Sequence, residues 1–160
     1  MDRIQETVTF VGRPFPDTMM DKQRSYTACN MKTENDPVFQ KFLKDNNLQT
    51  QRTNMIVFGP DNFMYWYGVL TTKVRNIPSG LMKYQLPKAK VAEESSADQT
   101  LAFFNMPLNA VLPKFLKKLA TRGVKVYENV GDSPTPYVLQ TLNLDTKQTN
   151  LVLDYESTDS

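Results

Sequence analysis

An order of secondary-structure patterns that occurs twice along the chain constrains its fold most. On each side of about Pro78, a strand pattern precedes an amphipathic helix pattern, and further strand patterns follow the helix. This order is typical of an α+β domain, in which helices gather on one face of an antiparallel sheet. We therefore predict an α+β fold of two fused β-α-β-β repeats, whose strands pair edge to edge into one antiparallel sheet with both helices on one face.

The first helix pattern has a clear beginning, and a strand pattern precedes it. Residues 7–11 are rich in β-branched side chains, and Gly12 and the breaker Pro14-Phe15-Pro16 are expected to end that strand. Asp36 is a typical N-cap, and Pro37 suits the first helical position because its missing N–H costs nothing there. The apolar residues that follow share one helical face, so a short helix is predicted from Pro37 onward.

A hairpin follows this helix. Residues 55–58 and 63–70 are two apolar strand patterns, and the segment 59–62 between them has the Gly-Pro-Asp-Asn composition of a tight turn. Residues 16–35 give no clear assignment, and residues 25–29 within them are compatible with a strand or an irregular cover.

The second helix is the best defined element of the sequence. Its apolar residues keep helical spacing on one face, namely Leu112, Phe115, Leu116, Leu119 and Ala120. Pro113 places its regular start close by, and Gly123 provides the C-terminal stop. Strand patterns surround this helix at residues 89–93, 124–128, 137–142 and 150–155.

The chain length sets the domain organisation. At 160 residues one domain is the default, and it is long enough to bury a substantial core. We predict a first repeat of about residues 1–75, a Pro/Gly connector over 76–87, and a second repeat of about residues 88–156.

The composition excludes several functional classes. The sequence has no histidine, so imidazole-based nucleophilic catalysis and histidine metal sites are impossible. The single cysteine, Cys29, cannot form an internal disulfide or a cysteine-rich zinc site, and it fits a reducing, cytoplasmic compartment. No metal or other cofactor is expected. A net charge of +2 gives no electrostatic reason to expect direct nucleic-acid binding, and no apolar run is long enough to span a membrane.

Aromatic residues of the hairpin suggest a binding face. Alternation along a strand sends Phe63, Tyr65 and Tyr67 to one side of the sheet and Trp66 to the other. One side packs against the helices, and the concave face opposite them is rich in aromatics and needs a cover. These aromatics are either core residues or the wall of a ligand cleft, which we expect on the face away from the helices.

Three stretches in order resemble the GyrI-like small-molecule-binding family, which includes effector-binding domains of MerR- and AraC-type multidrug-responsive activators. They are Tyr65-Trp66-Tyr67-Gly68-Val69, Ile77-Pro78-Ser79-Gly80-Leu81 and Leu86-Pro87-Lys88-Ala89-Lys90-Val91-Ala92. Val126-Tyr127-Glu128 is similar to the family's aromatic-Glu strand. The His-x-Gly that typically follows the second-repeat strand is absent, and the first 35 residues match little.

The resemblance implies a cleft for bulky, planar and often cationic ligands. It places Tyr65, Trp66, Tyr67 and Tyr127 in the cleft wall and Glu128 as the carboxylate that compensates a bound cation. From the residues alone, a solvent-facing strand position is the favoured interpretation of Glu128. We expect a small hydrophobic or cationic ligand, no DNA-binding part within the chain, and binding rather than enzymatic activity.

Two other functions follow from the same resemblance. One is a protein-interaction module of the gyrase-inhibitor type, whose partner would be gyrase or a regulator. The other is a hydrolase of reactive drug-like compounds, with Glu128 as the general base. The hydrolase function ranks lower because the sequence offers no further catalytic group beside Glu128.

Overall fold

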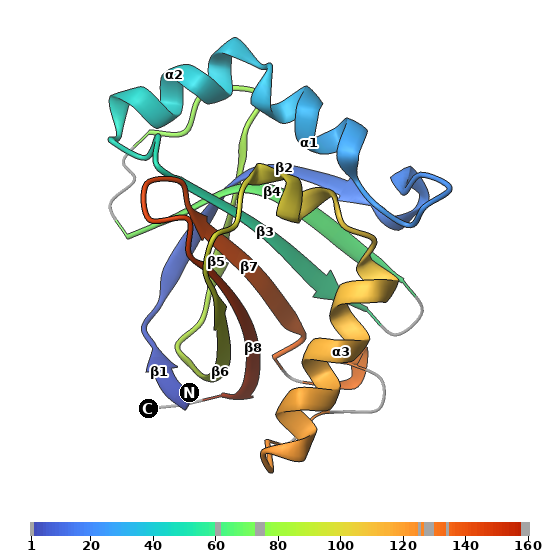
Figure 1. Ribbon diagram of the computed structural model, residues 1–160. Helices are drawn as coiled ribbons and strands as arrows, with labels where there is room; N and C mark the ends of the chain where they lie inside the picture. The colour runs from blue at the N-terminus through green and yellow to red at the C-terminus, as the bar shows by residue number, and fades with distance from the viewer. Residues whose placement is uncertain are drawn as a thin grey trace.

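One antiparallel sheet of eight strands organises the described part of this protein, and three α-helices pack on it (Figure 1). The computed structural model describes residues 2–59, 62–72, 76–124, 126, 130–133 and 135–157. The strands are β1 (Asp2–Gln5), β2 (Val8–Pro16), β3 (Gln51–Phe58), β4 (Phe63–Thr71), β5 (Met82–Leu86), β6 (Ala89–Ser96), β7 (Tyr137–Asn143) and β8 (Thr149–Ser157). The helices are α1 (Thr27–Glu34), α2 (Pro37–Asp45) and α3 (Leu108–Thr121), with 3₁₀ turns η1 (Asp17–Met19), η2 (Leu101–Asn105) and η3 (Val130–Asp132). The α+β fold class is therefore confirmed.

The strand order reveals two equivalent halves. Along the sheet the order is β1-β6-β8-β7-β3-β4-β2-β5. Each half contributes its strands in the same order, β2-β4-β3 in one and β6-β8-β7 in the other, and the halves meet where β3 pairs with β7. The edge strands are exchanged, because β1 precedes β2 but pairs with β6, whereas β5 precedes β6 but pairs with β2.

All three helices lie on the same face of the sheet. On β7, Val138 packs in the cluster under α3, and Leu142, four residues further on, packs in the cluster under α1 and α2. Residues an even number apart on a strand share a face, so both clusters belong to one side of the sheet. The predicted placement of the helices is correct.

The opposite face lies inside the curl of the sheet. Tyr84 of β5 and Tyr137 of β7 are separated by three strands, so a flat sheet would hold them about 19 Å apart. Their ring centroids are 5.8 Å apart, and the Tyr84 hydroxyl donates a hydrogen bond of 3.1 Å to the Tyr137 hydroxyl oxygen. The sheet therefore curls around this face, and apolar side chains from seven strands pack there.

Two strand predictions differ from the structure. β2 continues through Gly12 and Pro14 to Pro16. Its pairing with β5 ends at Gly12, so Pro14 lies where β2 has a described partner strand on one side alone, and proline is tolerated at such edge positions. Residues 82–86, expected to belong to a connector, form the edge strand β5. The predicted strand over 124–128 falls largely outside the described residues.

The helix predictions also need two corrections. Residues 27–34 lie in the segment without a clear assignment, and they form α1, whose amphipathic pattern is weak because only Cys29, Asn30 and Thr33 are buried. α3 begins at Leu108 rather than near Pro113. Pro113 therefore lies inside the helix, where it removes one backbone hydrogen bond but leaves the apolar face continuous.

The N-cap predicted at Asp36 is present at the start of α2. Its carboxylate accepts a hydrogen bond of 2.9 Å from the Val38 N–H and also pairs with the Arg13 guanidinium. We expect Asp36→Ala to lower the unfolding free energy by about 1–2 kcal/mol, because a cap and a partly buried ion pair are lost together. Urea denaturation measures this loss, and Asp36→Asn, which keeps a capping oxygen, should lose less. Equal losses in both variants would show that the cap contributes little.

No helix in the described part of the chain is both long and apolar enough to cross a membrane.

Candidate functional site

Tyr65 and Tyr67 lie in the core beneath the helices. The Tyr65 ring stacks on Tyr26 with centroids 4.0 Å apart, and its hydroxyl donates a hydrogen bond of 2.6 Å to Asn30 Oδ1. Asn54 Nδ2 donates to the same hydroxyl oxygen at 3.3 Å. Burial raises the pKa of Tyr65 well above its usual value. The hydroxyl therefore stays protonated and joins α1 to the sheet.

Tyr67 belongs to a polar network that includes a buried arginine. Its hydroxyl donates a hydrogen bond of 2.6 Å to Glu34 Oε2, and Arg52 Nε donates to the same carboxylate oxygen at 2.6 Å. The Arg52 guanidinium also lies over the Phe39 ring, 5.7 Å from its centroid. Burial and the Glu34 charge raise the pKa of Tyr67 far above its usual value. This network connects α1, α2, β3 and β4.

Trp66 faces the other way, into the curl of the sheet. Its ring meets Phe10 edge-on at 5.9 Å and Tyr84 edge-on at 5.7 Å, and only 7% of the residue is exposed. Alternation along β4 thus separates Trp66 from Tyr65 and Tyr67, as the sequence predicts. The three aromatics do not line one common wall, and the ligand contacts predicted for them remain predictions. Tyr127 and Glu128 lie outside the described residues.

The curl also holds an acidic residue that the sequence reasoning missed. Asp154 is 4% exposed on β8, and burial raises its pKa to about 7, although the Arg3 charge opposes this shift. The nearby Tyr137 also has a raised pKa, first through its own burial and partly through Asp154. The signal was an aspartate within an apolar strand pattern, where aspartate is unfavourable.

An apolar cavity of about 440 Å³ lies on the helix face, where elements of the two repeats meet. The hairpin contributes Ile56, Phe58 and Phe63, the segment after η1 contributes Met20 and Arg24, and α3 contributes Leu108, Leu112 and Pro113. Its volume falls within the range of small-molecule sites, and its walls are mostly aliphatic and aromatic, as such sites require. We take this cavity as the candidate binding site.

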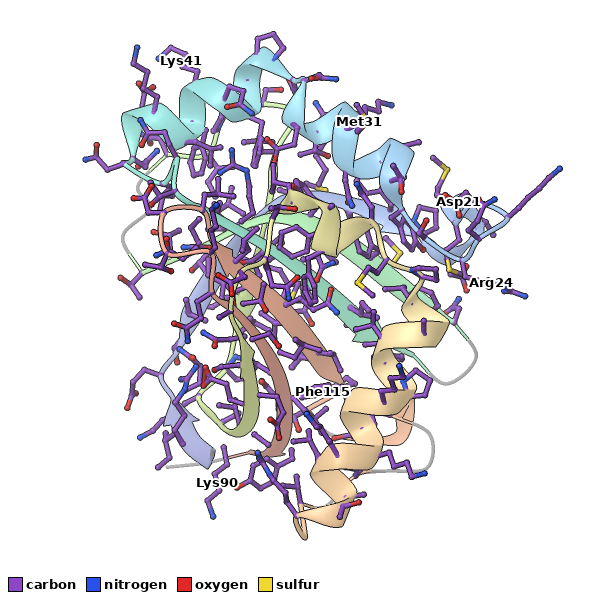
Figure 2. The ribbon with its side chains drawn as sticks, in the orientation of Figure 1. Asp21, Arg24, Met31, Lys41, Lys90 and Phe115 are labelled. Carbon is purple, nitrogen blue, oxygen red and sulfur yellow. The ribbon has the colours of Figure 1, made fainter. Side chains whose placement is uncertain are left out.

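Hydrogen bonds hold the wall between η1 and α1 in place. Asp21 Oδ1 accepts hydrogen bonds from the backbone N–H groups of Gln23 and Ser25, and these bonds lower the pKa of the aspartate. The Arg24 carbonyl accepts a hydrogen bond of 3.0 Å from the Leu108 N–H, which links this segment to the first turn of α3. Figure 2 shows Asp21 and Arg24 near the N-terminal end of α3.

Arg24 is the charged residue among the described residues that line the cavity. It adopts a left-handed backbone conformation, with φ of 64°, which is uncommon for a residue other than glycine. The described wall therefore supplies apolar contacts and one positive charge, and it supplies no carboxylate.

Two buried amides lie at the seam between the repeats, on the same face of the sheet as the cavity. Asn54 and Gln140 are cross-strand partners on β3 and β7, and both are almost fully buried. In the described part of the chain, Asn54 Oδ1 and Gln140 Nε2 have no hydrogen-bond partner. Buried polar atoms are usually paired, so these two mark the seam as a place with unused hydrogen-bonding capacity.

Other hollows fit less well with a site shared by the repeats. A hollow of about 670 Å³ lies between α2 and the connector, and its connector wall begins at Asn76, next in sequence to the undescribed residues 73–75. A hollow of about 400 Å³ lies at the rim of the curl, around Arg3, Gln51 and Leu70. We expected the cleft on this face, but the described cavity there is confined to the rim because aromatic and aliphatic side chains fill the centre.

Sequence reasoning located part of the cavity. Phe58 and Phe63 flank the predicted hairpin turn, and Leu112 belongs to the predicted apolar helix face. Met20 and Arg24 come from the segment without a clear pattern, so nothing in the sequence indicated that they would reach α3. Among the described residues, no group of three or more acidic or cysteine side chains is arranged to hold a metal ion.

Known structures share this fold. No protein-family model matches the sequence, and neither does any curated protein. The chain is similar to the structure of SAV2435 bound to tetraphenylphosphonium, with a TM-score of 0.60 and 8% identity over 98% of this chain and 93% of that chain. It is also similar to a Staphylococcus aureus MU50 protein named as a candidate bacterial transcription regulator, with a TM-score of 0.54 and 7% identity over 98% and 97% of the two chains.

A third similar structure is EcmrR in a complex with DNA. Its TM-score is 0.53 at 7% identity, and the match covers 99% of this chain but 57% of EcmrR. At these identities the likeness establishes the fold alone.

Proposed function

We propose that this chain is a small-molecule-binding domain related to the effector-binding domains of transcription regulators. The observation that carries the proposal is the apolar cavity at the junction of the two repeats, between the β3–β4 hairpin and α3. A ligand there would contact both repeats at once, so its binding would change how tightly the halves are joined. Such coupling is what a sensing domain needs, because a ligand shifts a conformational equilibrium only through differential contacts.

The similar structures support the ligand class. SAV2435 shares the fold and is bound to tetraphenylphosphonium, a bulky aromatic cation. In this chain, Phe58 and Phe63 have ring centroids 6.0 Å apart at the cavity, and aromatic rings attract both flat ligands and cations. The proposed ligand is therefore a bulky aromatic compound. This proposal includes the GyrI-like resemblance of the sequence and the predicted role of Glu128 as the counter-charge to a bound cation.

We also propose that the domain binds its ligand without catalysing a reaction and without contacting DNA directly. The described cavity wall consists mostly of hydrocarbon side chains, which provide no general acid or base. EcmrR, in contrast, is in a complex with DNA, and the present chain corresponds to only 57% of it. We propose that this domain does not contact DNA itself, so any effect on transcription would pass through a separate DNA-binding domain.

Calorimetric titration with tetraphenylphosphonium tests the proposed site. Wild-type protein should bind it saturably, and Leu112→Trp should weaken binding at least tenfold because the indole occupies the cavity. Met20→Trp fills the cavity from the opposite wall and should have a similar effect. Leu116→Trp, one turn along the same helix and outside the cavity lining, is the matched control and should bind like the wild type.

The same titration shows whether tetraphenylphosphonium binds in this cavity or elsewhere. Equal affinities in Leu112→Trp, Met20→Trp and Leu116→Trp would place the ligand elsewhere and contradict the proposal. Glu128→Gln adds a test of the predicted counter-charge, since loss of that carboxylate should weaken the binding of a cation.

A further inference from the structure

A second groove runs along α3, on the side that faces β6 and β8. Its volume is about 770 Å³, and it is lined by η2, by α3 and by the neighbouring parts of the two strands. It shares no lining residue with the apolar cavity described above. The two hollows therefore use different parts of α3 and are separate sites.

One end of the groove is apolar. Phe103 and Met106 lie at the N-terminal end of the helix, Ala110 and Val111 continue this surface along α3, and the buried Phe115 also lines the groove. Met106 is 45% exposed, so apolar surface at this end is open to solvent. The hydrophobic effect favours covering it.

The other end of the groove is cationic. Lys114, Lys117 and Lys118 lie within two turns of α3, and within the described residues none of them forms an ion pair. Arg122 closes this end, where its guanidinium pairs with Glu94 of β6 at 2.6 Å. Cations are common near a helix C-terminus, but that preference does not explain the adjoining apolar surface.

The order of these surfaces along one helix points to one kind of occupant. We propose that the groove binds a small amphiphilic anion, with its hydrocarbon body over Val111 and Phe115 and its acidic head group beside Lys117 and Lys118. The volume is that of a small-molecule site, whereas a stable protein partner would need about 800 Å² of surface on each side. Charge complementarity selects an anion, which distinguishes this ligand from the one proposed for the apolar cavity.

Calorimetric titration with decanoate below its micellar concentration tests the proposal, with 1-decanol as the uncharged probe of equal chain length. Wild-type protein should bind decanoate saturably and 1-decanol at least tenfold more weakly. The double variant Lys117→Gln/Lys118→Gln should lose at least tenfold in decanoate affinity. Lys32→Gln/Lys44→Gln removes two exposed charges from α1 and α2 and should bind decanoate like the wild type.

One more variant and two more measurements test the proposed groove. Ala110→Asp places a negative charge at an exposed position in the groove and should abolish decanoate binding without unfolding the helix. Equal decanoate affinity in the two double-lysine variants would overturn the proposal, as would competition between decanoate and tetraphenylphosphonium for one site. Sedimentation of the protein with anionic phospholipid vesicles, without binding of free decanoate, would also overturn it in favour of a membrane surface. Because the groove is a separate site, failure of tetraphenylphosphonium to bind would leave this result unaffected.

Discussion

Glu34→Ala should lower the unfolding free energy of this protein by about 3–5 kcal/mol, because it leaves a buried arginine without its counter-charge. Arg52 is 5% exposed, and it donates hydrogen bonds from Nε and Nη2 to the two oxygens of Glu34, at 2.6 and 3.2 Å. The Tyr67 hydroxyl would lose its acceptor in the same variant. Urea denaturation at neutral pH measures the loss.

The control for this prediction is an exposed ion pair. Lys41 and Asp45 form an i,i+4 pair on the surface of α2, at 2.6 Å. Asp45→Ala should therefore cost no more than about 0.5 kcal/mol. If Glu34→Ala and Asp45→Ala lost similar amounts of unfolding free energy, Arg52 would have gained another partner or water in Glu34→Ala. The network around Glu34 would then not be what holds α1 against the sheet.

Asp154→Asn should remove much of the pH dependence of stability between pH 5 and pH 8. The pKa of Asp154 rises from its ordinary value of 3.8 to about 7 in the folded protein, chiefly through burial. Between these values the folded state keeps a proton that the unfolded state releases, so stability falls as pH rises toward 7 and then levels off. From pH 5 to pH 8 the wild type should lose about 2–3 kcal/mol through this residue, at about 1.4 kcal/mol per pH unit.

Urea denaturation at several pH values measures this effect. The asparagine side chain does not ionise, so the unfolding free energy of Asp154→Asn should stay nearly constant over that range. Asp145→Asn changes an exposed aspartate in the β7–β8 turn and should retain the wild-type slope. An unchanged slope in Asp154→Asn would show that Asp154 reaches solvent or a cation. Within the described residues, the Arg3 charge opposes the rise in the pKa of Asp154, and Asp154 in turn contributes to the raised pKa of Tyr137.

Local sequence signals located most elements with strong periodicity. The α2 cap at Asp36, the hairpin and the apolar face of α3 depend on residues close together in sequence, so they could be predicted. β5 could not, because it depends on β2, a partner strand from the other half of the chain. The continuation of β2 past Gly12 could not either, because it depends on pairing with β4, about 50 residues further along the chain, which overrides the local Gly and Pro signals. α1 also escaped prediction, since its buried residues include the polar Asn30 and Thr33, whose partners are distant in sequence or within the helix.

The candidate site was predicted less completely. Alternation correctly separated Trp66 from Tyr65 and Tyr67, but it could not decide which face is hollow. The curl of the sheet brings Tyr84 beside Tyr137 and fills the face where the cleft was expected. The described cavity instead lies where the segment holding Met20 and Arg24 meets α3, a contact made through the hydrogen bond between the Leu108 N–H and the Arg24 carbonyl.

The sequence by itself determined the α+β class, the two-fold outline and the lack of any histidine for catalysis or metal binding, because these depend on composition and short-range periodicity. Tertiary structure alone decided where the cavity lies, that Asp154 is buried with a raised pKa, and that α3 borders two separate hollows. These features depend on the direction in which the sheet curls and on contacts between the two halves, which exchange their edge strands. Both are set by packing over the whole chain, which no local pattern of residues records.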